Sequence, residues 1–340
     1  MSLVELLPAP APARHGIRRA AIAGLGCALP AEAVPTEDVA RRVGVATDWI
    51  LRRTGIASRR RLPDGSTLAG LAVEAGAAAL RDAGVDGADL DAVIVATASA
   101  DDVMPAAAPL VATRLGARRA MAWDVNLACT GFLAGIEQGA ALVESGRANR
   151  VLVVAADTLH RVTDHDDRRT AAIFGDGAGA VVLARDGALR LGPSLLRAEE
   201  DHARALVVGH DERRVRMDGQ VVFQHALADM ESCCRELLDV AGLGVEDLDL
   251  VVPHQANARI TTALAQRLGL EHEQVVDAIA EVGNTGAASI PVALAHARRD
   301  GRIPERGRVL LTAFGAGFAF GAVLLDVERP LPAMDERAAA

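Results

Sequence analysis

The sequence repeats itself at a nearly constant offset, and this feature constrains the possible folds more than any other. The segment Asp89-Leu90-Asp91 recurs as Asp247-Leu248-Asp249, which lies 158 residues further along the chain. Three more landmarks recur in the same order at offsets between 153 and 158 residues: Arg114-Leu115-Gly116 as Arg267-Leu268-Gly269, Cys129-Thr130-Gly131 as Asn284-Thr285-Gly286, and Arg150-Val151-Leu152-Val153 as Arg308-Val309-Leu310-Leu311. Ordered matches at a nearly constant spacing are typical of duplicated units. We therefore expect two similar half-domains that share one core.

Segments typical of helices and of buried strands alternate in both repeats. Residues Leu68–Ala83 place apolar side chains at helical spacing. Short apolar runs predict buried strands at 91–97, 150–156, 180–183, 248–252 and 308–312. Because these runs show almost no polar alternation, we expect a sheet that is covered by helices on both faces. Two such halves predict a layered α/β/α/β/α body.

The same patterns suggest how the chain divides. We expect a flexible extension at 1–17, a first half over 18–186, a second half over 187–328 and a flexible tail at 329–340. Residues 185–200 mix glycine, proline and charge, so they are the expected crossing point between the halves. The uncharged stretch 309–325 contains Gly315, Gly317 and Gly321, which favours a strand, a turn and a second strand over a membrane span.

Composition excludes several classes of function. The net charge of −9 argues against a broad nucleic-acid-binding surface, and aromatic residues are only 2% of the chain. All 36 basic residues are arginine, which excludes catalysis through a lysine Schiff base or a P-loop lysine. The four cysteines are too unevenly spaced for a disulfide framework or a zinc ribbon. With no secretion signal evident, we expect a cytoplasmic protein that binds no metal, nucleic acid or membrane.

Cys129 is the first candidate for chemistry. It lies where a strand-like run meets a helix-like run. Unpaired N–H groups and the helix dipole at such a position stabilise a thiolate by up to ~2 kcal/mol, so the dipole alone would lower the thiol pKa by about one unit from about 8.5. The competing interpretation is a small buried hydrophobic residue, which is the class we assign to Cys27, Cys233 and Cys234.

His254 lies just past the predicted strand at 248–252, at the strand end where open α/β sheets build their sites. A lone histidine is more often structural than catalytic, but the repeat changes this balance. Asn284 is the counterpart of Cys129, and pseudo-twofold symmetry would bring two helix starts and one strand end to a common centre. Cys129, His254 and Asn284 would there form a thiol nucleophile with two hydrogen-bond donors. The glycine-rich turn at 315–317 suits an oxyanion, with a plain hairpin as the alternative.

Three motifs together resemble the 3-oxoacyl-acyl-carrier-protein synthase III family of the thiolase superfamily. They are the Cys129 segment, the run VPHQANARI that ends at Ile260, and the run GNTGAAS that ends at Ser289. The similarity extends over about residues 18–327, and the combination of motifs is highly specific. It implies a thiolase-like fold: a duplicated five-layer α/β/α/β/α body with pseudo-twofold related halves.

The resemblance also implies a two-stage condensation. Cys129 would take an acyl group from acyl-CoA as a thioester. His254 and Asn284 would hydrogen-bond the thioester carbonyl of malonyl-acyl-carrier-protein while CO2 leaves, and the carbanion would attack the acyl-cysteine. The backbone N–H groups of Cys129 and Ala316 would hold the oxyanion, each donor being worth roughly 3–4 kcal/mol in known cases. This chemistry needs no cofactor, and the glycines at 175–179 lack the spacing of a dinucleotide site.

The same comparison implies a binding path for CoA. Residues 47–56 resemble the family segment whose Trp and Arg sandwich the adenine, which gives roles to Trp49 and Arg53. Arg168 corresponds to a second arginine beside the adenine. Four more residues correspond to positions along the pantetheine tunnel or at its mouth: Gly219, Phe223, Asn257 and Arg259. Arg259 also suits the acidic surface of the carrier protein, and a solvated surface charge is the alternative for each arginine.

Four positions depart from the family pattern. Ala316 replaces the usual middle glycine of the oxyanion loop, Phe320 stands where tryptophan is common, and Arg169 replaces a small residue. Met104 stands where phenylalanine is frequent, at the position that closes the acyl pocket of the partner in a homodimer. Because methionine adapts its shape, we expect a pocket that accepts primers longer or more branched than acetyl.

The leading hypothesis is therefore an acyltransferase that starts fatty acid or polyketide chains. The alternative within this fold moves an acyl group to an alcohol or amine without decarboxylation. A non-catalytic chain-length partner is a third class, and the presence of Cys129 argues against it. The sequence names neither the primer nor the pathway.

Overall fold

The computed structural model describes residues 19–331 of the chain. The predicted extension at 1–17 lies outside the described residues, and so does the predicted tail beyond residue 331. Within the described part, no helix combines the length and the apolar character needed to cross a membrane.

The two halves share most of their order of elements, and strand β5 of the first half has no counterpart strand in the second half as described. The first half contains β1 (Ala21–Ala28), α3 (Leu68–Ala83), β4 (Ala92–Ala96), α4 (Ala107–Arg114), β5 (Met121–Val125), α5 (Gly131–Glu144), β6 (Val151–Thr158) and β7 (Asp176–Ala184). The second half contains β8 (Leu189–Ala198), α6 (Gly219–Ala241), β11 (Leu250–Pro253), α7 (Ala258–Leu268), α9 (Ser289–Arg299), β12 (Gly307–Gly315) and β13 (Ala319–Val327). The predicted helix and all five predicted strands are confirmed, with ends that shift by a few residues.

Shorter elements are inserted between the main strands and helices of each half. Between β1 and α3 the chain forms β2 (Glu32–Pro35), α1 (Thr36–Val43), α2 (Thr47–Thr54) and β3 (Ser58–Arg61). Between β8 and α6 it forms β9 (Leu206–Val208) and β10 (Val215–Met217), and α8 (Ile279–Val282) precedes α9.

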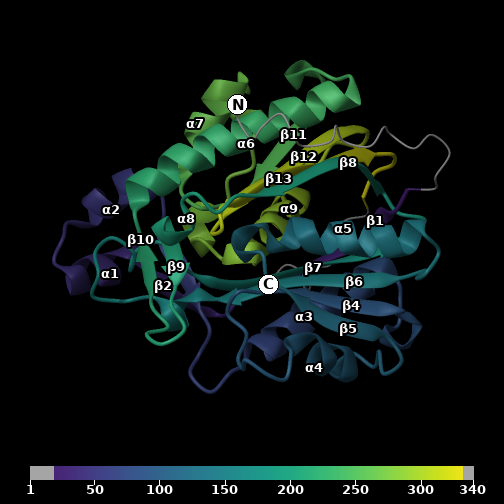
Figure 1. Ribbon diagram of the computed structural model, residues 1–340, viewed down its shortest axis with the longest axis horizontal. Helices are drawn as coiled ribbons and strands as arrows, with labels where there is room; N and C mark the ends of the chain where they lie inside the picture. Colours follow the sequence, from purple (N-terminus) through teal and green to yellow (C-terminus); the bar gives the residue numbers. More distant parts are fainter. Residues whose placement is uncertain (1–18, 332–340) are drawn as a thin grey trace.

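The elements stack in five layers (Figure 1). Helices α6 and α7 lie over the strands β8, β13, β12 and β11, and helices α5 and α9 form the central layer. The strands β1, β7, β6, β4 and β5 follow, with α3 and α4 on their outer face. This arrangement confirms the predicted α/β/α/β/α body.

Strand pairing shows that the two halves are structural repeats. The first half has the order β1-β7-β6-β4-β5 and the second has β8-β13-β12-β11. The pair β4 and β6 is parallel and continues antiparallel through β7 to β1, and the pair β11 and β12 is parallel and continues antiparallel through β13 to β8. The four strands of the second half thus repeat the order and directions of β1, β7, β6 and β4, as a duplication predicts, while β5 has no counterpart strand within residues 19–331.

The repeated landmarks occupy equivalent places. The Asp91 carboxylate accepts the backbone N–H of Arg150 at 3.2 Å, and the Asp249 carboxylate accepts that of Arg308 at 2.8 Å. In the reverse direction, the N–H of Asp91 donates to the carbonyl of Arg150 and the N–H of Asp249 donates to the carbonyl of Arg308, each at 3.0 Å. The repeat was detectable because these residues start equivalent strands in both halves.

Residues 185–200, the expected crossing point between the halves, contain strand β8, which was not among the predicted strands. Strand β8 pairs with β13 along most of its length, while Leu189 and Arg190 at its start pair with β1. It therefore joins the two sheet layers into one hydrogen-bonded ladder of nine strands within residues 19–331. Gly192 and Pro193 concealed it, because β8 is only half-buried and lacks the continuous apolar run of the other strands.

Candidate active site

Cys129 lies in a short 3-10 helix, Ala128–Thr130, directly before α5. This confirms its predicted place between a strand and a helix start. The end of β12 packs on it so closely that a Cβ atom at Gly315 would lie 2.9 Å from the backbone nitrogen of Cys129. Only glycine fits at 315, so the second half of the chain shapes the surroundings of the thiol.

The pKa of the Cys129 thiol is shifted in the direction opposite to the one expected from the helix start. Burial raises the pKa of this thiol to about 12, and the negative charge of the buried Asp157 adds to the effect. The sequence-based expectation of a lowered pKa was therefore wrong, because it considered the helix dipole without the packing of β12. The resting thiol is protonated and needs a base to become a nucleophile.

His254 follows β11, as predicted, and is almost fully buried. Its backbone N–H donates to the carbonyl of Thr312 at 2.7 Å, and its ring atom Nδ1 lies 2.5 Å from Oγ of Ser289. Burial lowers the pKa of His254 to about 4, so the ring is neutral near pH 7. With Nδ1 occupied by Ser289, Nε2 is the ring nitrogen left for chemistry.

Asn284 is held by its backbone and keeps part of its side chain available. Its N–H donates to the carbonyl of Ile173 and its carbonyl accepts the N–H of Gly175, both at 2.9 Å. The side-chain Oδ1 accepts the N–H of Gly286 at 2.9 Å, which fixes the orientation of the amide. The Nδ2 group then has no hydrogen-bond partner within residues 19–331 and is free to donate.

The three residues meet at one cavity of about 650 Å³. Cys129, His254 and Asn284 all line it, and the 3-10 helix of Cys129 contacts the equivalent 3-10 helix Gly286–Ala288 that follows Asn284. Two helix starts and one strand end therefore face the same cavity, and the catalytic roles of the three side chains stay a prediction.

The same cavity collects every residue expected along the CoA path. Trp49, Arg53, Arg168, Gly219, Phe223, Asn257 and Arg259 all line it. The Arg53 guanidinium stacks over the Trp49 ring at 4.1 Å, and the Arg259 guanidinium lies 5.4 Å from the centre of the Phe223 ring. Asn257 also caps α7, because its side chain accepts the N–H of Arg259 at 2.9 Å.

Two predicted site residues lie outside this cavity. Ala316 is in the turn between β12 and β13, where Gly315 rather than Ala316 lines the cavity. Met104 is 81% exposed and lies near the equally exposed Val103. A single chain does not bring Met104 to Cys129, so its expected role in a partner's pocket stays a prediction.

Much of the apolar wall of the cavity was not predicted from the sequence. One face of α6 lines the cavity with Val222, Ala226 and Met230, and Phe174 and Phe314 come from outside that helix. The spacing of the α6 residues by four positions was a usable helical signal. Ser289 and Asp157 were also missed as contributors, because their contacts join segments that are far apart in the sequence.

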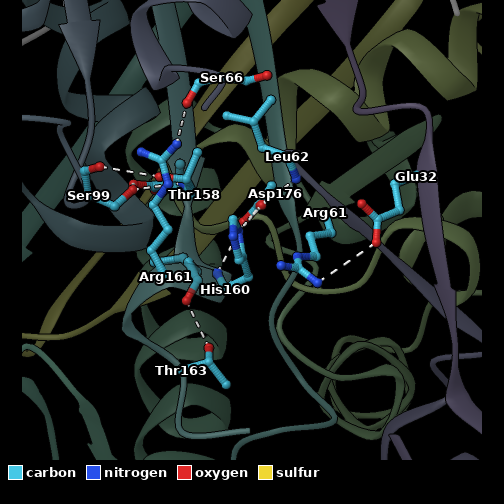
Figure 2. A network of polar contacts seen from close by, with 12 residues as sticks. Glu32, Arg61, Leu62, Ser66, Ser99, Thr158, His160, Arg161, Thr163 and Asp176 are labelled. Atoms are coloured by element: carbon cyan, nitrogen blue, oxygen red, sulfur yellow. Dashed lines mark hydrogen bonds and ion pairs between the residues drawn. The ribbon is translucent and has the colours of Figure 1, made fainter. Parts of the chain in front are cut away.

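A polar network holds the residues that directly follow β6 (Figure 2). The fully buried Asp176 carboxylate accepts the backbone N–H groups of Leu62 at 2.8 Å and His160 at 3.1 Å, and it also pairs with the His160 ring. Arg161 donates to the carbonyl of Ser66 at 2.7 Å. The network thus anchors the start of the loop that leads from β6 to Arg168 at the cavity.

Fold and site together define a class of protein. A duplicated five-layer body that brings a thiol, a neutral imidazole and an amide donor into one cavity is a thiolase-like acyltransferase. The neutral imidazole provides a base for the protonated thiol, and the amide provides a donor for a carbonyl oxygen.

Comparison with known proteins identifies the family. Residues 123–199 match the family model 3-Oxoacyl-[acyl-carrier-protein (ACP)] synthase III, and residues 238–327 match the model of its C-terminal part. The Streptomyces coelicolor protein Beta-ketoacyl-[acyl-carrier-protein] synthase III 2 is 42% identical, and the alignment covers 96% of this chain and 99% of the relative. The chain therefore belongs to the 3-oxoacyl-acyl-carrier-protein synthase III family, which confirms the resemblance.

Solved structures agree with this assignment. The 3-oxoacyl-(acyl carrier protein) synthase III from Pseudomonas aeruginosa has a TM-score of 0.88 and 40% identity, covering 92% of this chain and all of that one (100%). The priming beta-ketosynthase of the R1128 polyketide biosynthetic pathway has a TM-score of 0.87 and 35% identity, covering 94% of this chain and 100% of that one. The fold is thus shared with a 3-oxoacyl-(acyl carrier protein) synthase III and with a priming ketosynthase of a polyketide pathway.

Proposed function

We propose that this protein condenses an acyl-CoA primer with malonyl-acyl-carrier-protein and so starts fatty acid or polyketide chains. The observation that carries the proposal is the convergence of Cys129, His254 and Asn284 on one cavity that also holds the Trp49–Arg53 stack. Membership of the family supports the proposal, because the relative named Beta-ketoacyl-[acyl-carrier-protein] synthase III 2 aligns with 96% of this chain.

In the first stage, the acyl group moves to Cys129. Nε2 of the neutral His254 takes the thiol proton, and the sulfur attacks the thioester carbonyl of acyl-CoA. The backbone N–H groups of Cys129 and Ala316 hold the oxyanion of the tetrahedral intermediate. The C–S bond to CoA then breaks, and CoA leaves with the proton from His254.

In the second stage, the protonated form of Nε2 and the Nδ2 group of Asn284 donate to the thioester carbonyl of malonyl-acyl-carrier-protein. Cleavage of the bond to the carboxylate releases CO2, and the two donors stabilise the resulting enolate. The enolate carbon attacks the acyl carbonyl on Cys129. Collapse of this intermediate breaks the C–S bond, releases 3-oxoacyl-carrier protein and leaves a thiolate that takes up a proton.

The cavity mouth supports binding of CoA. The stacked Trp49 and Arg53 offer a planar surface for an adenine, and Arg168 and Arg169 offer charge to phosphates. Arg259 at the start of α7 suits the acidic surface of a carrier protein. The chain's overall net charge of −9 does not oppose this, because four arginines line the cavity: Arg53, Arg168, Arg169 and Arg259.

We also propose a homodimer. Strand β5 forms one edge of the nine-stranded ladder, and an edge strand is open to pairing with a second copy. Met121 on β5 is 47% exposed, and Val103 and Met104 are exposed as well. Such a dimer provides the setting in which Met104 closes the acyl pocket of its partner. A light-scattering mass of one chain at micromolar concentration would contradict this part.

Localisation in the cytoplasm and independence from cofactors complete the proposal. Cys129, Cys233 and Cys234 are free thiols, which suits a reducing compartment. Every step above uses thioester and proton-transfer chemistry of the chain itself. We therefore expect activity to be unchanged by a chelator such as EDTA, and loss of activity that added divalent metal restores would contradict this expectation.

The test of the function is release of CO2. Wild-type protein is incubated with butyryl-CoA and malonyl-acyl-carrier-protein labelled at the free carboxyl carbon. We expect labelled CO2 and 3-oxoacyl-carrier protein in equal amounts. Acyl transfer to an added alcohol or amine without CO2 would favour the alternative acyltransferase and overturn the proposal.

A further inference from the structure

Asp157 carries a buried carboxylate at the next-to-last position of strand β6, and it is only 1% exposed. It lies 158 residues before Gly315, which is the offset of the Arg150 and Arg308 landmarks. Asp157 is therefore the counterpart in β6 of the residue in β12 that packs on Cys129. The two halves differ at this position: one has a carboxylate and the other has no side chain.

Each of these two residues reaches into the opposite half. Gly315 of the second half lies against the backbone of Cys129 in the first half. Asp157 of the first half accepts the backbone N–H of Ala287 in the second half at 2.8 Å. Ala287 lies in the 3-10 helix that directly follows Asn284 and Thr285. At equivalent positions of the two halves, Gly315 thus lies beside Cys129, and the Asp157 carboxylate lies beside the loop that follows Asn284.

The carboxylate joins three segments through four donors. Its Oδ1 atom accepts the side chain of Ser99 at 2.7 Å, the N–H of Ala98 at 2.9 Å and the side chain of Thr97 at 3.2 Å. Its Oδ2 atom accepts the Ala287 N–H. An ionised carboxylate accepts only, so it satisfies four converging donors as an amide cannot. Burial raises the pKa of this carboxyl, and the four donors oppose that rise by stabilising the ionised form.

The neighbouring glycine shows how closely the loop is held. Gly286 has a φ of +60°, and a Cβ atom at this position would overlap Oδ2 of Asp157. The N–H of the same Gly286 donates to Oδ1 of Asn284, which fixes the direction of the Asn284 amide. Asp157 and Asn284 therefore hold adjacent peptide groups of one loop.

We propose that Asp157 is a positioning residue that fixes the 284–287 loop and thereby aims the Asn284 amide for the decarboxylating stage. This inference rests on the proposed function, in which Asn284 acts in the second stage and not in the acylation of Cys129. Asp157 touches no reacting atom, but its charge contributes to the raised pKa of the Cys129 thiol. Its loss therefore makes the thiol easier to deprotonate and will not slow acylation, whereas it will slow the decarboxylating stage.

The test measures the two stages separately in wild type, Asp157→Asn and Asp157→Ala. Acylation is the rate at which butyryl-CoA labels Cys129, and decarboxylation is the rate of CO2 release from the acylated protein with malonyl-acyl-carrier-protein. We expect acylation not to slow, because the variants remove a charge that raises the pKa of the Cys129 thiol. We expect CO2 release to fall about 30-fold, which corresponds to about 2 kcal/mol for a buried N–H left unpaired. Equal loss in both stages would overturn the proposal.

Asp82→Asn is the matched control. The Asp82 carboxylate in α3 accepts the N–H of Leu25 at 2.9 Å and the guanidinium of Arg298 at 2.6 Å, so it ties distant segments together without contacting the loop. Any loss of stability in this variant will affect both stages equally. A selective loss of CO2 release in Asp82→Asn would mean that general destabilisation, and not Asp157, separates the stages.

A second readout does not depend on turnover. Hydrogen exchange is followed for the peptide that covers residues 284–288 and for the one that covers 127–132. In Asp157→Ala we expect about 10-fold faster exchange in the first peptide and little change in the second. Unchanged exchange at 284–288 would contradict the positioning role. If the wild type itself releases no CO2, the proposed function fails, while the exchange result still decides whether Asp157 holds the loop.

Discussion

The Nδ1 atom of His254 lies 2.5 Å from the hydroxyl oxygen of Ser289, and both residues are buried. A hydroxyl can donate to this nitrogen or accept from it, whereas a carbonyl or carboxylate only accepts. Nε2 of His254 can therefore present a lone pair in the acylation stage and a proton in the decarboxylating stage. The partner at Nδ1 thus suits a histidine that must both accept and donate.

Ser289→Ala tests this relationship. The substitution leaves Nδ1 unpaired inside the protein, at a cost of about 1–3 kcal/mol, and we expect CO2 release to fall about 10-fold or more. Ser145→Ala is the matched control, because Ser145 ends α5 and is exposed. Steady-state rates of both variants give the answer. Full activity in Ser289→Ala would show that the tautomer of His254 is set elsewhere.

The raised pKa of Cys129 predicts how the free enzyme reacts with alkylating agents. Its folded value of about 12 exceeds the unfolded value of about 8.5, so the thiol stays protonated through neutral pH. By linkage, this difference stabilises the folded state below about pH 8.5, and the stability is lost as pH rises toward the folded pKa. We expect the rate at which iodoacetamide labels Cys129 to keep rising between pH 7 and about 10.

Peptide mapping by mass spectrometry measures that labelling rate for Cys129 alone. The urea-unfolded chain serves as the control, and its labelling will level off near pH 9, above the ordinary thiol pKa of about 8.5. A plateau below about pH 7 in the folded protein would show a thiolate ion in the resting state and contradict the role given to His254 as base.

Arg53→Ala will weaken acyl-CoA binding without slowing the chemistry. The guanidinium stacks on Trp49 at the cavity mouth, so its loss affects substrate and transition state alike. We expect the KM for acyl-CoA to rise about 10-fold with kcat within about 2-fold. Arg52→Ala is the control, since Arg52 is exposed and pairs with Asp48 on the same helix. A lowered kcat with unchanged KM would contradict the assignment.

Met104→Phe will narrow the choice of primer if Met104 closes the pocket of a partner subunit. We expect acylation by butyryl- and branched acyl-CoA to fall about 10-fold while acetyl-CoA changes little, because a rigid ring replaces an adaptable chain. Val103→Ala, at an equally exposed neighbour, is the control. A strict preference of the wild type for acetyl-CoA would refute the expectation.

Much of the fold was predictable because the repeated residues occupy equivalent structural positions in the two halves. The Asp91 and Asp249 landmarks start equivalent strands, so their spacing reported the duplication directly. Five strands with continuous apolar runs were predicted and are largely buried, whereas the buried strand β1, which glycines interrupt, was not predicted. Strand β8 was missed because it is half-buried and contains Gly192 and Pro193, which are typical of loops.

The sequence predicted which candidate catalytic residues line the site, but it did not predict the direction of the Cys129 pKa shift. The motifs and the repeat together brought Cys129, His254 and Asn284 to one cavity. The direction of the Cys129 pKa shift was not predictable, because it depends on burial under Gly315, a residue that lies 186 positions later. The contacts of Asp157 and Ser289 likewise join distant segments, and no local pattern signals them.

The central claim is that the Cys129 thiol becomes an acyl thioester. Intact-mass spectrometry of the wild type after mixing with butyryl-CoA tests it most directly, with Cys129→Ala and Cys234→Ala measured beside it. The account predicts one butyryl group on the wild type and on Cys234→Ala, removable by hydroxylamine, and none on Cys129→Ala. Butyryl on Cys129→Ala, or an unmodified wild type across a panel of acyl-CoAs, would contradict the account.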